Sequence, residues 1–262
     1  MNRLRAAIRA MTARYPVVAT GATLSAVDYR ICGEEHGPDS PIVVLLHGFS
    51  SSGSELVPFA RSISAPARFV FPDGPLDLAS TGLPGRAWWP IDVAARDRAV
   101  SENRPRDLSS WVPEGLAAAR AQVNALLDAV RARLGPAPLV VGGFSQGAML
   151  SCDVALRSSR RLAGLVLFSP ARIAAAEWAP LLGSLRGMRV VVSHGREDRD
   201  LSFAAAESLR NDLCAAGCDV RWVPFEGGHE VPLVAWRQLR TLLRELATGQ
   251  GVPPRSPPAR PR

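Results

Sequence analysis

The chain has 262 residues and a mass of 28.0 kDa, which suits one α/β domain better than two small ones. Hydrophobic residues make up 47% and charged residues 21%, so a chain that is disordered over most of its length is excluded. The sequence contains no lysine, and the net charge of +7 comes from arginines in residues 1–20 and 249–262. Between these ends 24 arginines balance 24 acidic residues. The charge therefore does not indicate a basic domain face, and we expect no nucleic-acid partner.

The two ends differ from the rest of the chain. Residues 1–20 form an expected basic N-terminal extension, and residues 249–262 are rich in proline and arginine and are expected to be disordered. Residues 21–248 are expected to form a single domain. No stretch approaches 18 apolar residues, so stable membrane insertion is not expected.

The cysteines indicate a reducing environment. Cys32, Cys152, Cys214 and Cys218 have neither the CxxC spacing of a metal or redox site nor the density of a secreted disulfide scaffold. The N-terminus lacks the unbroken apolar core of a secretory signal. We therefore expect a cytoplasmic location. Nothing in the sequence indicates an oligomeric state.

Short apolar runs alternate with helical patterns along the chain. Six apolar runs are typical of strands buried on both faces: 42–46, 68–71, 139–142, 164–168, 189–193 and 220–224. A weaker strand is expected before them, at 27–32. Helical patterns lie at 54–63, 112–134, 146–157, 203–216 and 231–246. This alternation predicts the α/β class, with a mostly parallel, doubly wound sheet and helices on both faces. In such sheets the functional site lies beyond the carboxyl ends of the strands.

The segment 72–113 interrupts this alternation. It is long, rich in proline and glycine, and contains Trp88, Trp89 and Trp111. Three large apolar rings argue against a disordered loop, because leaving them in water is costly. The segment is expected either to pack over a sheet edge or to form a wall of a substrate pocket.

The strongest chemical signal is Gly143-Phe-Ser-Gln-Gly147, a G-x-S-x-G sequence between an expected strand and an expected helix. A tight strand-to-helix turn would project the hydroxyl of Ser145 outward, and small residues two positions away on either side would make room for it. The helix N-terminus would offer backbone N–H groups to a developing oxyanion. The competing interpretation is a serine that caps a helix in a glycine-rich turn.

A nucleophilic serine needs a histidine base, which follows the serine in this architecture. Of the four histidines, His36 and His47 precede Ser145. His194 ends an expected strand, with no later strand separating it from the expected acid. His229 lies in a glycine loop after the last expected strand and before the last helix. The order along the chain therefore predicts His229 as the base.

The acid that orients this base should follow the penultimate strand. Glu197, Asp198 and Asp200 all lie there, and periodicity does not choose among them. For the oxyanion hole we expect the backbone N–H of Gln146 and that of Phe49, which follows an earlier strand. We interpret His47, two residues before Phe49, as a structural residue of this turn.

The chain resembles the phospholipase/carboxylesterase family of α/β hydrolases, which includes acyl-protein thioesterases. The resemblance covers roughly residues 40–245, where matching motifs occur in the family's order. They are Leu46-His-Gly-Phe49, Gly143-Phe-Ser-Gln-Gly147, His194-Gly-Arg-Glu-Asp198 and Gly228-His-Glu230, with a softer match at Gly85-Arg-Ala-Trp-Trp-Pro-Ile-Asp92.

This resemblance implies a serine hydrolase that cleaves a small-molecule carboxylic ester or thioester through an acyl-serine, without a cofactor or metal. It implies Asp198 as the triad acid. Asp200 stays an alternative, because the family usually has small and aliphatic residues after the aspartate, where this chain has Arg199 and Asp200. It also implies that Trp88 and Trp89 flank the acyl pocket.

Two other functions fit the same motifs. A peptidase or amidase could use the same triad, because the triad does not encode the leaving group. A non-catalytic binding protein of this fold would be expected to lack a triad member, whereas the sequence supplies all three.

Overall fold

The computed structural model describes residues 28–249, so the expected N-terminal extension and nearly all of the expected tail lie outside the described residues. The described residues build a central seven-stranded sheet and a separate two-stranded hairpin. The sheet contains β1 (Tyr29–Cys32), β2 (Ile42–Leu46), β3 (Arg68–Pro72), β6 (Leu139–Phe144), β7 (Gly164–Phe168), β8 (Arg189–Gly195) and β9 (Asp219–Phe225), and the hairpin pairs β4 (Leu76–Asp77) with β5 (Arg86–Ala87).

The strand order is β1-β3-β2-β6-β7-β8-β9. All neighbours pair in parallel except β1, which runs antiparallel to β3 at the sheet edge. After β2 the chain forms β3 on one side of that strand, and it later returns to form β6 on the other side. The order of the sheet therefore reverses between β2 and β6, and loops that follow these two strands diverge at that point.

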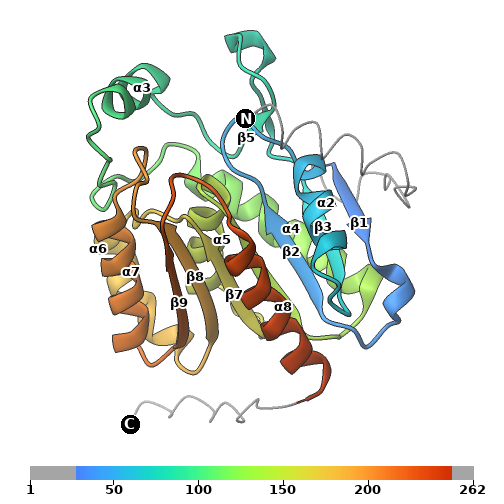
Figure 1. Cartoon of the computed structure of the whole chain (residues 1–262). Helices are drawn as coiled ribbons and strands as arrows, with labels where there is room; N and C mark the ends of the chain where they lie inside the picture. Colours follow the sequence, from blue (N-terminus) through green and yellow to red (C-terminus); the bar gives the residue numbers. More distant parts are fainter. Residues whose placement is uncertain (1–27, 250–262) are drawn as a thin grey trace.

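Helices cover both faces of the sheet (Figure 1), which confirms the predicted fold class. The helices of the described residues are α2 (Gly53–Ser62), α3 (Val93–Ser101), α4 (Leu116–Leu134), α5 (Gln146–Leu156), α6 (Ala175–Trp178), α7 (Phe203–Ala215) and α8 (Leu233–Ala247), with the 3-10 turns η1 (Glu34–His36), η2 (Ala79–Thr81) and η3 (Ala179–Leu185).

The core is divided between the two faces because successive side chains of a strand point in opposite directions. In β2, Val43 and Leu45 pack in the cluster that contains the apolar faces of α2 and α8. Val44 and Leu46 pack in the cluster formed with α4, α5 and α7. All four side chains are buried, which explains why this strand is an uninterrupted apolar run in the sequence.

One boundary differs from the prediction, and two segments contain elements that were not predicted. The helix expected from residue 112 begins at Leu116, because Gly115 before it has a left-handed backbone, with φ of 89°. The segment 72–113 is not a plain loop: it contains the β4–β5 hairpin and α3, which project beyond the sheet at the top of Figure 1. The segment 175–185, for which no element was predicted, forms α6 and η3.

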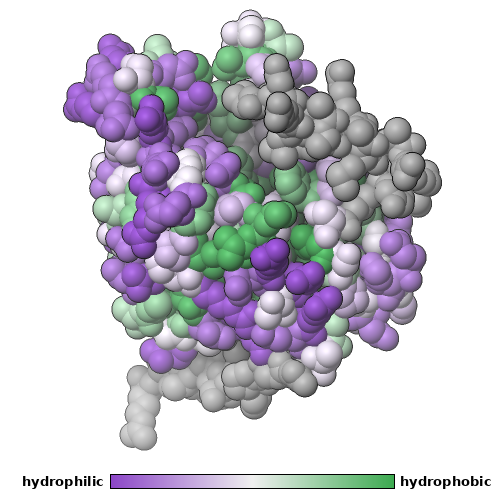
Figure 2. All heavy atoms as spheres, in the orientation of Figure 1, coloured by the Kyte–Doolittle hydropathy of each residue, from purple (hydrophilic) through white to green (hydrophobic). Residues whose placement is uncertain are grey.

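The face that carries α2 and α8 is mixed in hydropathy (Figure 2), and apolar atoms gather near the start of α8. Leu233 is 67% exposed there and Val234 39%. Within residues 28–249, no helix has the length and apolar character that crossing a membrane requires.

Candidate active site

Ser145 lies at the turn between β6 and α5. Its φ of 53° and ψ of −117° fall outside the regions that non-glycine residues normally occupy. The Ser145 N–H donates to the carbonyl of Phe168 on the neighbouring strand, at 2.9 Å. A strained backbone held in place by surrounding structure is common at functional sites, and here it turns the hydroxyl out of the sheet.

The glycines that flank Ser145 allow backbone segments to approach very closely. A Cβ on Gly143 would lie 2.4 Å from the Leu46 carbonyl oxygen, and a Cβ on Gly147 only 2.2 Å from the same atom. Real Cβ atoms do not approach other atoms so closely. The turn therefore sits directly against the end of β2, and glycine is required at both positions for steric reasons.

His229 follows β9 and reaches the serine hydroxyl. Its Nε2 lies 2.8 Å from Ser145 Oγ, and its ring packs against Phe144 with 4.8 Å between ring centroids. Gly195 permits the histidine loop to approach β8, since a Cβ there would lie 2.3 Å from the carbonyl oxygens of Gly227 and Gly228.

Asp198 contacts the other nitrogen of this imidazole, with 2.7 Å between Oδ2 and His229 Nδ1. Burial raises the pKa of Asp198, but hydrogen bonds from His194 and His229 outweigh it and hold that pKa well below its usual range. Asp200 does not contact His229. It forms an ion pair with Arg106 instead and lies 3.9 Å from Arg96. Of the two sequence alternatives, the structure thus places Asp198 beside the imidazole.

His47 fixes the loop that follows β2. Its Nδ1 donates to the Gly48 carbonyl at 2.7 Å, and its Nε2 accepts the Gly74 N–H at 2.8 Å. Burial lowers the pKa of His47 and outweighs the opposing hydrogen bond to Gly48, so the ring is neutral. Gly48 lies close to the serine: a Cβ there would be 3.4 Å from Ser145 Cβ. The next residue, Phe49, carries a backbone N–H for which no acceptor occurs among residues 28–249.

Gln146 connects the nucleophile turn to the aromatic segment. Its Oε1 accepts the Trp88 N–H, and its Nε2 donates to the Trp89 carbonyl, both at 2.9 Å. Its own N–H belongs to the first residue of α5 and has no partner within the helix. Both tryptophans are buried, but only Trp89 is among the residues that line the cavity at Ser145. Trp88 donates its indole N–H to the His47 carbonyl instead.

A cavity of about 160 Å³ opens at the serine. Its wall is mostly aromatic and aliphatic, with charged side chains where the loop after α3 meets the loop after β8. Besides Ser145, Gln146, His229, Phe49 and Trp89, it is lined by Ile91, Arg96, Arg106, Leu108, Trp111, Phe144, Met149, Asp200 and Leu201. Several of these come from the segment predicted as a possible pocket wall, but no sequence pattern indicated which of its residues would face the serine.

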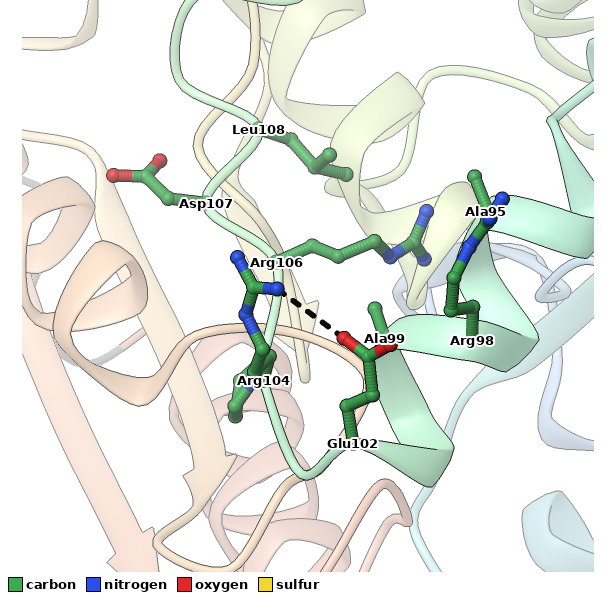
Figure 3. A pocket seen from close by; sticks show the side chains of 9 residues that line it. Ala95, Arg98, Ala99, Glu102, Arg104, Arg106, Asp107 and Leu108 are labelled. Carbon is green, nitrogen blue, oxygen red and sulfur yellow. Dashed lines mark hydrogen bonds and ion pairs between the residues drawn. The ribbon is translucent and has the colours of Figure 1, made fainter.

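A second, more open cavity of about 450 Å³ lies between α3 and the loop that follows it (Figure 3). Arg106 extends across this space toward α3, while Arg104 pairs with Glu102 at 3.2 Å. Arg106 and Leu108 line both cavities. They therefore separate this groove from the space at Ser145.

Comparisons with known proteins agree with this geometry. The sequence pattern of the Phospholipase/Carboxylesterase family matches residues 29–246. Acyl-protein thioesterase 1 of Schizosaccharomyces pombe is 28% identical over 195 residues, which cover 71% of this chain and 81% of that protein.

Solved structures share the fold. The crystal structure of esterase PE8 superposes with a TM-score of 0.69 at 24% identity, covering 84% of this chain and 99% of that one. A carboxylesterase from Mesorhizobium loti superposes with a TM-score of 0.67 at 20% identity, covering 87% of this chain and 98% of that one. The chain therefore belongs to the phospholipase/carboxylesterase family of α/β hydrolases and is a hydrolase of carboxylic esters or thioesters.

Proposed function

We propose that Ser145 is the nucleophile of this hydrolase, with His229 as its general base and Asp198 as the acid that orients the base. The observation that carries the proposal is the continuous chain of contacts from Ser145 Oγ to His229 Nε2 at 2.8 Å and from His229 Nδ1 to Asp198 at 2.7 Å. In this arrangement Nδ1–H donates to the carboxylate, so Nε2 is left to accept the serine proton.

In the first step Ser145 Oγ attacks the carbonyl carbon of the ester or thioester, and its proton passes to His229 Nε2. The carbonyl oxygen becomes an oxyanion, for which the N–H groups of Phe49 and Gln146 are the donors. When the tetrahedral intermediate collapses, the bond to the alcohol or thiol breaks. The leaving group takes the proton from His229, and the acyl group stays on Ser145.

In the second step water attacks the acyl-serine carbonyl, and His229 accepts a proton from that water. The bond to Ser145 Oγ then breaks, and the serine recovers its proton from the imidazolium. The products are a carboxylic acid and the free enzyme. No step needs a cofactor or a metal.

The cavity supports a compact acyl group. Its volume of about 160 Å³ is below the range of about 300–1,000 Å³ for pockets that bind drug-sized ligands. Trp89, Ile91 and Met149 provide apolar contact, and Arg106 and Leu108 close the side toward the second cavity. Thioesters belong among the candidate substrates because a relative is named an acyl-protein thioesterase. We also propose a cytoplasmic location, as the cysteine spacing leads us to expect.

A fluorophosphonate probe tests the nucleophile, because it reacts covalently with activated serines. Wild-type protein should be labelled at Ser145, and Ser145→Ala should abolish labelling and lower kcat by about 10⁴-fold or more. Ser208→Ala is the matched control, since Ser208 is exposed on α7 and, among the described residues, its hydroxyl donates to the Ala204 carbonyl of the same helix alone. Absence of labelling in folded wild-type protein would contradict the proposal.

Matched p-nitrophenyl esters from acetate to dodecanoate, with the corresponding acyl thioesters and amides, then test the substrate class. The cavity predicts the highest kcat/KM for short acyl chains, with amides slowest. A preference for dodecanoate would contradict the assignment of this cavity to the acyl group.

A further inference from the structure

A second histidine contacts Asp198. His194 is the next-to-last residue of β8, and its Nε2 lies 3.2 Å from Asp198 Oδ2, the same oxygen that faces His229. Both side chains of this second pair are fully buried. The sequence motif His194-Gly-Arg-Glu-Asp198 therefore brings its first and last residues together, and the hydrolytic mechanism above leaves the first of them unused.

The surroundings of His194 determine which of its nitrogens carries the proton. Nε2 faces two acceptors, Asp198 Oδ2 and the Leu201 carbonyl oxygen, each at 3.2 Å. A nitrogen between two acceptors must be a donor. Nδ1 is buried and has no hydrogen-bond partner among the described residues. The hydrogen bonds from Nε2–H therefore hold the ring in this orientation, while the buried Nδ1 has no hydrogen-bond partner.

Asp198 is surrounded by donors on both oxygens. Its Oδ1 accepts the backbone N–H groups of Asp200 and Leu201, each at 2.9 Å, while Oδ2 faces the two histidines. These contacts leave the carboxylate little freedom to rotate or shift. Only the contact with His194 comes from a side chain other than that of the base.

The other elements packed on His194 present apolar groups. Phe203 of α7 contacts the ring edge-on, with 6.0 Å between centroids, and Pro224 of β9 is its partner across the sheet. The guanidinium of Arg196 lies over the Phe203 ring, 4.9 Å from its centroid. Asp198 is therefore the charged side chain in contact with His194 among the described residues.

We propose that His194 is a positioning residue for the hydrolysis, whose Nε2–H holds Asp198 in the orientation that His229 requires. The inference rests on the proposed function, because it concerns the same triad. The hydrogen bond also takes up part of the charge on Oδ2. Removing it leaves a carboxylate that is less fixed and that holds the imidazolium form of His229 more strongly.

Three substitutions separate this role from simple packing. His194→Gln places its amide nitrogen where Nε2 lies and keeps the donor. His194→Asn places its nitrogen near the Nδ1 position, too far from Asp198, and His194→Phe keeps the ring without any donor. We expect Asn and Phe to lower kcat by about 10- to 100-fold with little change in KM, because the base is misplaced in the transition state. Gln should restore most of the activity.

The pH dependence of kcat/KM distinguishes the two roles, because a residue that serves only in packing would not change it. For His194→Asn and His194→Phe, the acidic limb of kcat/KM should shift to higher pH, whereas for His194→Gln it should stay where the wild-type limb lies. Thermal unfolding of each variant shows that the compared proteins are folded. If the Phe protein does not fold, the comparison of Asn with Gln decides.

Equal loss of activity in His194→Gln and His194→Asn, or an unshifted acidic limb in His194→Asn and His194→Phe, would overturn the proposal. Failure of the proposed function would look different. In that case the wild-type protein itself would show no Ser145-dependent hydrolysis, whatever residue stands at position 194.

Discussion

The close contact at Gly147 predicts a large effect from a single methyl group. In Gly147→Ala the new Cβ would lie 2.2 Å from the Leu46 carbonyl oxygen and 2.6 Å from that of His47. Both neighbours are backbone atoms, so no side-chain rotation relieves the overlap. Reaching even 3.0 Å from Leu46 requires the turn and β2 to separate by about 0.8 Å.

This separation should reduce both stability and activity. Overpacking of a well-packed site costs about 1–3 kcal/mol, which corresponds to a decrease in Tm of about 2–12 °C for a domain of this size. A displacement approaching 1 Å between Ser145 and the oxyanion donors should lower kcat by about 10²-fold. Differential scanning fluorimetry and kcat measurements on a short-chain ester test the two effects.

Gly183→Ala is the matched control. Nothing lies within 4 Å of the position of its Cβ, and its backbone is not left-handed. The free energy of unfolding of this variant should stay within about 1 kcal/mol of the wild-type value, in either direction. If Gly147→Ala were as stable and active as Gly183→Ala, the argument that glycine is required at this turn would be refuted.

Three further predictions concern the acid, the pH dependence and the thiols. Asp198→Asn should lower kcat by about 10²- to 10⁴-fold, whereas Asp200→Asn should change it by less than about tenfold, because only Asp198 contacts His229; comparable losses would contradict the assignment of the acid. Despite the burial of Asp198, its hydrogen bonds hold its pKa well below the usual range, so the carboxylate stays ionised down to about pH 4 and takes up no proton of its own. On acidification log kcat/KM should therefore fall with a limiting slope of one, and a limiting slope of two above pH 4 would show a second titrating group. Cys214 is exposed, whereas burial raises the pKa of the Cys152 thiol, so iodoacetamide should alkylate Cys214 in the native protein and leave Cys152 unmodified until unfolding, as peptide mass spectrometry would show.

Local sequence rules were sufficient for the strands of the central sheet and for the serine turn. The strands of the parallel sheet are buried on both faces, which requires uninterrupted apolar runs such as Ile42–Leu46. The turn at Ser145 needs small neighbours at fixed positions, and Gly143 and Gly147 supply them. These features depend on residues adjacent in the chain, so they can be recognised without knowledge of the fold.

The start of α4 and the contents of the segment 72–113 were not predictable in the same way. The helical periodicity continues before Leu116, and only the left-handed backbone at Gly115 shows where the helix begins. The short β4–β5 hairpin and α3 bury few residues of their own, so they leave a weak apolar pattern.

The sequence by itself determined the class of fold and the order of the serine, acid and histidine motifs. It also placed these motifs at the carboxyl ends of the strands. The resemblance implied Asp198 as the acid and left Asp200 as an alternative. The tertiary structure shows Asp198 beside His229, because both residues lie on one loop and their directions depend on how that loop packs. The contact of His194 with Asp198 and the lining of the cavity at Ser145 were also decided in three dimensions. The physical reason is the same for each: hydrogen bonds and cavity walls depend on distances between side chains from separate elements, which spacing along the chain does not fix.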